Sequence, residues 1–459
     1  CTATDGTYDS DAEGFSCDLG SLSYGSYTVY IRTSADTPLG FQATTTDPTV
    51  GVDQGKSITV DENRIYVTGS CTGCGSLGNQ AIYTIAYDKS DGSLVWSTTT
   101  DPSTGTDFPT GIVNDTNNLY VGGYCNTGCG SLGGAAYYLI AYSKIDASYV
   151  WSTSTDPTVS GDYAYGIALD NSNVYLTGNC DGCGSLGSRA IYTVAYDKID
   201  GSFIWATTTD LTIGIDSANG ITTDNSNVYV TGYCTGCGSL GGAAYYTTAY
   251  LKTDASFVWA TTTDLTSGID YANGITTDNS NVYVTGYCTG CGSLGAQAIQ
   301  TIAYSKVDGS TVWSTTTDPT AGSDAAYSIA TDQDYVYVTG ICTGCGSLGG
   351  FAYYTIAYDK SDGSFVWSTT TDPTAGTDFG TAIVVNEQLI YVTGYCTGCG
   401  SLGSIAFYTV AYDKATGNTY TSGTDTDNTA FTKAAPPSGG GSSGTRVGSR
   451  SPRAQTVTP

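Results

Sequence analysis

The sequence predicts an all-β fold, a β-propeller of four-stranded antiparallel blades with an irregular C-terminal tail. The first observation is a repeated unit of about 54 residues, whose paired cysteines begin at Cys71, Cys125, Cys180, Cys234, Cys288, Cys342 and Cys396. The second is a tryptophan series with the same step, at Trp96, Trp151, Trp205, Trp259, Trp313 and Trp367. The third is that apolar residues recur at every second position, the period of a strand, with no helical stripe. A constant period of this size is typical of propellers and solenoids.

Each unit divides into four short strands. In the unit that begins at Ala325, we expect strands at residues 325–332, 334–342, 352–360 and 364–371. The segments between them contain the Gly, Asp and Ser residues that tight turns require. Four antiparallel strands per unit, repeated at a constant step, describe the blades of a propeller.

The two ends of the chain determine the number of blades. Residues 1–46 are a degenerate copy in which Phe41 takes the tryptophan position, and the last unit places Tyr420 near that position. Eight fourth-strand segments can be counted, so the sequence predicts eight blades, with a seven-bladed ring and an exchanged half-blade as the alternative. We expect one propeller domain at residues 1–427. Residues 428–459 form a Gly/Ser/Pro-rich basic tail that contains Lys433, Arg446, Arg450 and Arg453.

Charge and composition favour an extracellular protein. The net charge is −27, from 42 acidic and 15 basic residues, and such a body repels nucleic acid and anionic lipid. No apolar run reaches the roughly 18 residues that a membrane span needs. The sequence begins at Cys1 and contains no Met, so we expect that a leader has been removed. Sixteen cysteines indicate an oxidising compartment, and localisation outside the cell or on its surface is the prediction.

The cysteine pairs admit disulfides, metal or redox chemistry. A c-type haem is excluded because the chain has no His. A tetrahedral metal site takes two CxxC knuckles, and seven knuckles cannot all pair within one chain. Disulfides inside each loop are therefore predicted, and no metal is expected there. Cys1 is expected to pair with Cys17, with lipidation of Cys1 as the alternative. The predicted disulfide cysteines are Cys1, Cys17, Cys71, Cys74, Cys125, Cys129, Cys180, Cys183, Cys234, Cys237, Cys288, Cys291, Cys342, Cys345, Cys396 and Cys399.

Acidic residues six positions apart recur in the loops between units. The pairs are Asp47 and Asp53, Asp101 and Asp107, Asp156 and Asp162, Asp210 and Asp216, Asp264 and Asp270, Asp318 and Asp324, and Asp372 and Asp378. Such a pair could share a Ca²⁺ ion if carbonyls or water supplied the remaining ligands, whereas turn capping by Asp is the simpler interpretation. We therefore expect no cofactor, with calcium as the alternative. Asn114 lies in the one N-glycosylation sequon.

One stretch of each unit resembles a known repeat. The segment from Ala357 through Asp359, Asp362 and Gly363 to Trp367 resembles the tryptophan-docking repeat of quinoprotein-type propellers, and the wider unit resembles secreted bacterial β-propeller repeats. The resemblance implies packing between blades by Phe41, Trp96, Trp151, Trp205, Trp259, Trp313, Trp367 and Tyr420. Quinone-dependent members of this family use a stacking Trp, calcium and a disulfide of adjacent cysteines. This chain has no Cys-Cys pair and no tryptophan outside the packing position, so its cofactor-free scaffold relatives are the closer comparison.

No residue set points to catalysis, because every candidate carboxylate recurs in the other units. We therefore predict that the chain is not an enzyme. The leading hypothesis is a secreted structural or adhesive surface protein that assembles with copies of itself, or with other surface components, through its tail into a filament or lattice. The alternative is an extracellular propeller that binds glycan or protein, and a quinoprotein-like oxidoreductase ranks last.

Overall fold

The computed structural model describes residues 43–77, 80–186, 189–294, 296–401 and 405–419, together with the short segments 2–3, 15–16, 25–28 and 430–433. The chain forms two compact units. The first unit comprises Ala43–Tyr420, and the second contains Cys1–Gln42 and Thr421–Pro459.

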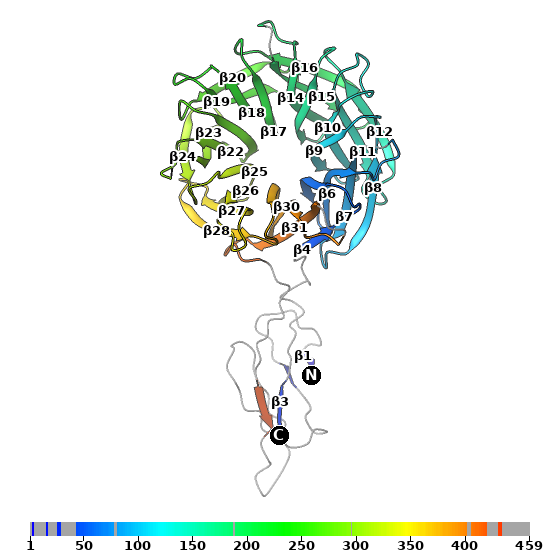
Figure 1. Ribbon diagram of the computed structural model, residues 1–459, viewed down its shortest axis with the longest axis vertical. Helices are drawn as coiled ribbons and strands as arrows, with labels where there is room; N and C mark the ends of the chain where they lie inside the picture. Colours follow the sequence, from blue (N-terminus) through cyan, green and yellow to red (C-terminus); the bar gives the residue numbers. More distant parts are fainter. Residues whose placement is uncertain are drawn as a thin grey trace, which may run out of the picture. The chain divides into compact units, whose positions relative to one another are not determined.

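The first unit is a β-propeller of seven four-stranded antiparallel sheets arranged as a ring (Figure 1). Blade 1 contains β5 (Asp53–Val60), β6 (Arg64–Thr72), β7 (Gln80–Asp88) and β8 (Leu94–Thr100). Blade 2 contains β9 (Asp107–Asn114), β10 (Asn118–Cys125), β11 (Ala136–Ser143) and β12 (Tyr149–Thr155). Blade 3 contains β13 (Asp162–Leu169), β14 (Asn173–Asp181), β15 (Arg189–Asp197) and β16 (Phe203–Thr209).

The next three blades repeat this pattern. Blade 4 contains β17 (Asp216–Thr223), β18 (Asn227–Thr235), β19 (Ala243–Leu251) and β20 (Phe257–Thr263). Blade 5 contains β21 (Asp270–Thr277), β22 (Asn281–Thr289), β23 (Gln297–Ser305) and β24 (Thr311–Thr317). Blade 6 contains β25 (Ala325–Thr331), β26 (Tyr335–Thr343), β27 (Phe351–Asp359) and β28 (Phe365–Thr371). The predicted all-β class is confirmed. No helix that could cross a membrane occurs in the part of the chain that the structure describes.

Blade 7 is completed by a strand from the other end of the unit. It contains β29 (Asp378–Val385), β30 (Leu389–Thr397) and β31 (Ile405–Asp413), and its outer strand is β4 (Ala43–Thr46), which pairs with β31. The expected eight blades are wrong, and the seven-bladed alternative is confirmed. The reason is that the segment before β5 takes the single free edge of β31, which the sequence had assigned to the segment near Tyr420.

The ring is closed, with the first strand of every blade at its centre. Each first strand packs against the first strands of the two neighbouring blades, and β5 packs against β29 at the closure. The fourth strands lie at the outer rim (Figure 1). In every blade a bulge interrupts the pairing of the first two strands, and such bulges increase the local twist of the strands.

A tryptophan in each of the first six blades forms a hydrogen bond to the blade that follows. Each indole N–H donates to the backbone carbonyl of a lysine in the next blade, as in the 2.9 Å bond from Trp259 to Lys306. The same contact is made by Trp96, Trp151, Trp205, Trp313 and Trp367. The lysine ammonium forms an ion pair with an aspartate of the preceding blade, for example Lys306 with Asp224 at 2.5 Å. The tryptophans thus lie between sheets, where a large flat side chain fills the space between twisted blades.

The second unit brings the two ends of the chain together. Strand β1 (Thr2–Ala3) pairs with β2 (Phe15–Ser16), and β3 (Gly25–Thr28) pairs with β32 (Ala430–Lys433). All the pairing in these two small sheets is antiparallel. Residues from near the two termini therefore share a sheet that is separate from the propeller sheets.

Candidate functional site: the disulfide-loop face and its aromatic cluster

The loop between the second and third strands of every blade is closed by a disulfide. The seven bonds join Cys71 to Cys74, Cys125 to Cys129, Cys180 to Cys183, Cys234 to Cys237, Cys288 to Cys291, Cys342 to Cys345, and Cys396 to Cys399. The predicted pairing within each loop is thus confirmed for these cysteines, and no free thiol is present among the described residues. Cys1 and Cys17 lie outside the described residues.

Each disulfide loop covers an aspartate that follows the outer strand of the same blade. In blade 2 the backbone N–H of Leu132 donates to Asp156 Oδ2 at 2.5 Å. A Cβ atom on Gly130, the residue after the second cysteine, would lie 2.4 Å from that oxygen, so only glycine lets the loop approach the carboxylate so closely. The same bond joins Leu186 to Asp210, Leu240 to Asp264, Leu294 to Asp318, and Leu348 to Asp372.

The second aspartate of each pair begins the next blade and is buried. Asp162 is fully buried at the start of β13, opposite Cys180 in β14. Its carboxylate accepts hydrogen bonds from the backbone N–H of Thr158 at 3.0 Å and from the Thr158 hydroxyl at 3.1 Å. The other oxygen of Asp156, Oδ1, is buried without a hydrogen-bond partner in the described part of the chain. Each loop thus places two carboxylates at the junction between consecutive blades.

This arrangement changes the acidity of the buried aspartates. Burial, opposed by the Thr158 hydrogen bonds and assisted by the charge of Asp156, raises the pKa of Asp162 to about 7. In the preceding junction burial is again the main cause, and it raises the pKa of Asp107 to about 6. One proton is therefore expected to stay at such a junction in mildly acidic solution.

The acidic pairs do not by themselves make a complete metal site. Over the described ranges, no group of three or more His, Cys, Asp or Glu side chains could hold a metal ion. Calcium prefers six to eight oxygen ligands, so two carboxylates would need help from carbonyls or water. Calcium at these loops stays a prediction.

Partly exposed aromatic side chains gather on the inner strands beside the disulfide loops. Most come from the first strand of a blade or from the end of its second strand, directly before the first cysteine, and Phe351 comes from the start of the third strand of blade 6. The members in ring contact are Phe108, Tyr124, Tyr163, Tyr165, Tyr233, Tyr271, Tyr287, Tyr327, Phe351, Phe379 and Tyr395. Burial and neighbouring tyrosines raise the pKa of Tyr271 and Tyr287 to about 12, so these hydroxyls stay protonated. We call this group the aromatic cluster.

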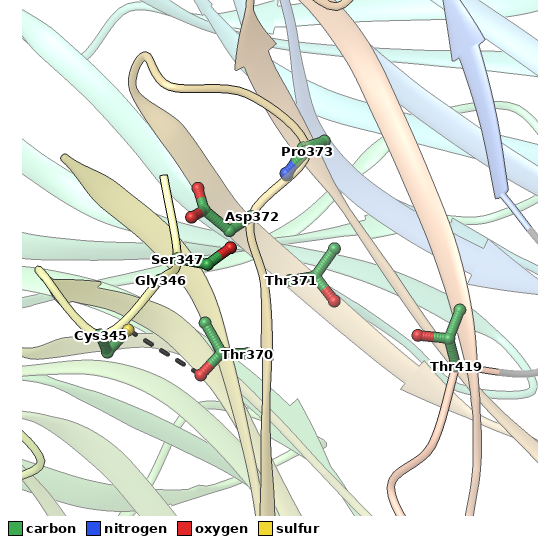
Figure 2. Close-up of a pocket in the computed structure, with 8 residues that line it drawn as sticks. All are labelled: Cys345, Gly346, Ser347, Thr370, Thr371, Asp372, Pro373 and Thr419. Carbon is green, nitrogen blue, oxygen red and sulfur yellow. Dashed lines mark hydrogen bonds between the residues drawn. The ribbon is translucent and has the colours of Figure 1, made fainter. Parts of the chain in front are cut away.

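An open hollow of about 490 Å³ lies nearer the rim, where blade 6 meets blade 7 (Figure 2). Its walls are the disulfide loop, the end of β28 and the turn after β31, and the lining residues are Cys345, Gly346, Ser347, Thr370, Thr371, Asp372, Pro373 and Thr419. The Asp372 carboxylate is already bonded to the backbone N–H of Leu348 at 2.6 Å. The remaining polar side chains are hydroxyls, so this hollow can offer hydrogen bonds to a ligand.

The other predicted site residues are only partly described. The Asn114 amide nitrogen, to which an N-linked glycan would attach, donates to the Thr59 hydroxyl at 2.8 Å and to the Val60 carbonyl at 3.2 Å. Lys433 is the last residue of β32, opposite Gly25. Phe41, Tyr420, Arg446, Arg450 and Arg453 lie outside the described residues.

Blade 3 contains polar residues that the sequence analysis missed. Asp181 replaces the threonine that follows the first cysteine in five other blades, and Arg189 faces it on β15. Asn179 takes the position that is tyrosine in four blades. These departures from the repeat were the signal that could have revealed them, because a single asymmetric group on a repeated scaffold is what a specific site requires.

Comparison with known proteins agrees with the fold. A family model described as that of the outer membrane protein assembly factor BamB matches residues 298–432. No curated protein sequence matches the chain significantly. Solved structures with a similar fold include the quinohemoprotein alcohol dehydrogenase of Comamonas testosteroni (TM-score 0.42, 13% identity, 77% of this chain and 66% of that chain). They also include the polysaccharide lyase Uly1 (0.48, 10%, 78% and 89%) and the WD40 propeller domain of Doa1 (0.46, 11%, 81% and 97%).

The family model matches residues 298–432 alone, so it supports a β-propeller whose repeat resembles that of quinoprotein-type propellers. The chain spans just under two thirds, 66%, of the length of the Comamonas alcohol dehydrogenase. The prediction that the chain is not an enzyme is contradicted, because alcohol dehydrogenases and a polysaccharide lyase are among the proteins it resembles. The argument failed because it treated repetition of the scaffold as repetition of every site, whereas function resides in sites built on a fold.

The residues of this chain do not fit a pyrroloquinoline quinone site of the kind that the resemblance implies. All six tryptophans donate their indole N–H to a lysine carbonyl between blades, and none is left to stack on a quinone. The seven described disulfides join cysteines three or four positions apart, not adjacent ones. We derive no quinone chemistry for this propeller.

Proposed function

We propose that the protein is an extracellular structural or adhesive propeller that assembles with copies of itself. The observation that carries this proposal is the outer rim, where the fourth strands end their sheets. The rim strands of blades 1 to 6 contain no charged residue, although the chain has a net charge of −27.

The rim is also apolar where it meets solvent. Phe203 is 61% exposed, Phe257 66% and Phe365 57%. Leu94 and Tyr149 occupy the same position in their blades and are also more than half exposed. Proteins that stay monomeric usually protect an edge strand with charge or proline, because its free N–H and C=O groups can pair with another chain. An uncharged edge with repeated large apolar residues therefore favours contact with a second copy.

The large apolar residues are distributed unevenly around the rim. Blade 5 begins its outer strand with Thr311, and blade 7 has Thr419 at the matching position. The strongly apolar rim strands are thus those of blades 1 to 4 and blade 6. An uneven distribution of this kind supports contacts in defined directions, as in a filament or lattice.

The chain ends supply a second means of linking copies. Residues 428–459 are basic by sequence while the rest of the chain is strongly acidic, so the tail would be attracted to an acidic neighbour. We propose that this tail, with Lys433, Arg446, Arg450 and Arg453, docks on an adjacent subunit. High salt is expected to weaken such a link because exposed charges are screened.

The cysteine chemistry supports the extracellular location in this proposal. Seven short-range disulfides favour an oxidising compartment, such as the cell exterior. The resemblance of the repeat to secreted bacterial propellers supports the same location.

Replacing Phe203 and Phe257 together by Lys tests the rim. Size-exclusion light scattering and electron microscopy of the full chain should show assemblies for the native protein and single propellers for the variant. The matched control replaces Val159 and Ile213 by Lys, which adds the same charge to residues that are 74% and 83% exposed in loops between blades. Assemblies that persist unchanged in the rim variant would refute the rim as the interface. A separate deletion of residues 436–459 together with Lys433→Ala should leave the propeller folded but monomeric. If that variant assembles normally, the tail is only a linker.

A further inference from the structure

One face of blade 3 departs from the repeat in a coordinated way. Tyr163 in β13 lies opposite Asn179 in β14, and Asp181 in β14 lies opposite Arg189 in β15. Residues two positions apart on a strand share a face, so all four side chains belong to the same face of the sheet. The position of Arg189 holds Gln, Ala, Phe or Ile in the other blades, and this face is therefore unique within the ring.

An ion pair fixes the guanidinium group on this face. Arg189 Nε lies 2.7 Å from Asp181 Oδ1, and a terminal guanidinium nitrogen lies 3.4 Å from Oδ2. The guanidinium also lies 6.0 Å from the centre of the Tyr163 ring. About a third of each charged side chain remains exposed. The pair thus presents donors and acceptors in a fixed orientation while its net charge is zero.

Three tyrosine rings from two blades lie together beside this pair. The Tyr124 ring centre is 5.0 Å from that of Tyr163 and 6.1 Å from that of Tyr165. The rings of Tyr163 and Tyr165 are nearly parallel, with an angle of 11° between their planes. All three side chains are partly exposed. Together they provide flat aromatic surface that a ligand can reach.

Asn179 adds a carbonyl oxygen that can still accept a hydrogen bond. Its side chain is 1% exposed, and its amide nitrogen donates to the Ser217 hydroxyl of blade 4 at 3.0 Å. The carbonyl oxygen is buried and accepts no hydrogen bond from the described residues. A buried acceptor of this kind is uncommon in native proteins and typically marks a place where water or a ligand completes the bonding.

We infer that Tyr124, Tyr163, Tyr165, Asn179, Asp181 and Arg189 form a binding site for a neutral pyranose unit of a polysaccharide. Aromatic faces carry partial negative charge, which suits the C–H face of a sugar ring. Guanidinium donors, carboxylate acceptors and an amide oxygen match adjacent sugar hydroxyls, each of which both donates and accepts. The site binds neutral rather than anionic sugars because Asp181 neutralises Arg189 and the body of the protein is strongly acidic. This inference goes beyond the proposed assembly and does not depend on it.

Affinity electrophoresis of the full chain tests the site. The gels contain laminarin, mannan or galactan as neutral probes and polygalacturonate as the anionic probe. At least one neutral probe should retard the protein, with no retardation by polygalacturonate. Tyr163→Ala and Arg189→Ala should each weaken binding at least tenfold, whereas Tyr163→Phe should retain it because the ring remains.

Tyr335→Ala is the control, since Tyr335 is a partly exposed tyrosine of blade 6 outside the aromatic cluster, with its ring centre 6.1 Å from that of Tyr337. This variant also loses an aromatic ring and should bind like the native protein. Thermal unfolding of every variant establishes that the propeller is intact. The inference is overturned if no neutral probe retards the native protein, if only polygalacturonate does, or if Tyr335→Ala weakens binding as much as Tyr163→Ala.

Discussion

Replacing Asp156 by Asn should stabilise the propeller at alkaline pH and not at acidic pH. Asp156 and Asp162 are the two carboxylates at the junction of blades 2 and 3, and Asp156 Oδ1 is buried without a partner among the described residues. Burial is the main cause, and the charge of Asp156 a smaller one, that raises the pKa of Asp162 from 3.8 to about 7. The folded state therefore keeps a proton that the unfolded state releases between about pH 4 and pH 7. Stability falls as pH rises through this window, because the folded state binds more protons.

The magnitude follows from the size of this shift. A displacement of about three pKa units corresponds to roughly 4 kcal/mol at the alkaline end of the window, taken as an upper bound. Burial is the largest cause of the shift, so removing the charge of Asp156 should remove only part of it. We expect Asp156→Asn to raise the free energy of unfolding by about 1–2 kcal/mol at pH 8.5. At pH 5 the pair already holds a proton, and the gain should vanish.

Urea unfolding at the two pH values measures this difference. The matched control is Asp334→Asn, which removes one negative charge from an exposed turn and reports the effect of net charge alone. Because Asn keeps an acceptor for the Leu132 N–H, the loop contact itself should survive. Equal destabilisation of Asp156→Asn at both pH values would refute the reasoning, as would native stability that rises with pH between 4 and 7.

Four other experiments test the packing, the cysteine pairing and the ring closure. Trp259→Ala should lower the free energy of unfolding by about 3–5 kcal/mol, measured by urea denaturation, because a side chain only 6% exposed leaves a cavity. Gly309→Ala should also destabilise, since Gly309 has φ of +72° and an added Cβ would lie 2.6 Å from the Trp259 ring; an unchanged unfolding midpoint would contradict this. Thiol labelling of the unfolded, unreduced protein should find almost no free thiol, and elemental analysis no stoichiometric zinc or iron; either metal would reverse the assignment of the cysteines. Backbone amide hydrogen exchange should be faster in Ala43–Thr46 than in β8, because β4 pairs with β31 over only four residues whereas β8 pairs with β7 over six. Equal protection of the two strands would contradict this expectation.

The strands of each blade could be predicted closely because their signals are local. The expected segments 334–342 and 364–371 correspond to Tyr335–Thr343 and Phe365–Thr371. Alternation of apolar residues and Gly or Asp turns act within a few residues of one another. Blade number was not predictable in the same way. Two segments, one before Asp53 and one near Tyr420, have fourth-strand patterns, and only one free edge exists at β31.

The candidate site could be predicted only in part. The acidic pairs were visible from their spacing of six residues, but their burial depends on a disulfide loop folding over the first aspartate and on the next blade covering the second. Comparing the repeats by their shared residues concealed Asp181 and Arg189, because other blades have different residues at these two positions. A repeat protein is better searched for positions where one copy departs from the rest.

Among the described residues, the junction between blades 7 and 1, where the ring closes, has the fewest of the hydrogen bonds and ion pairs that join neighbouring blades. At the six other junctions, the lysine that receives the indole bond also pairs with an aspartate of the preceding blade. At the closure the aspartate position holds Asn386, and blade 7 has no tryptophan. Strand β4 pairs with β31 over four residues, whereas β20 pairs with β19 over six. The hydroxyl contact between Thr46 and Tyr87 is retained at 2.5 Å. Because local opening begins where the fewest contacts must break, the ring should open first at β4, the strand closest in sequence to the N-terminal segment.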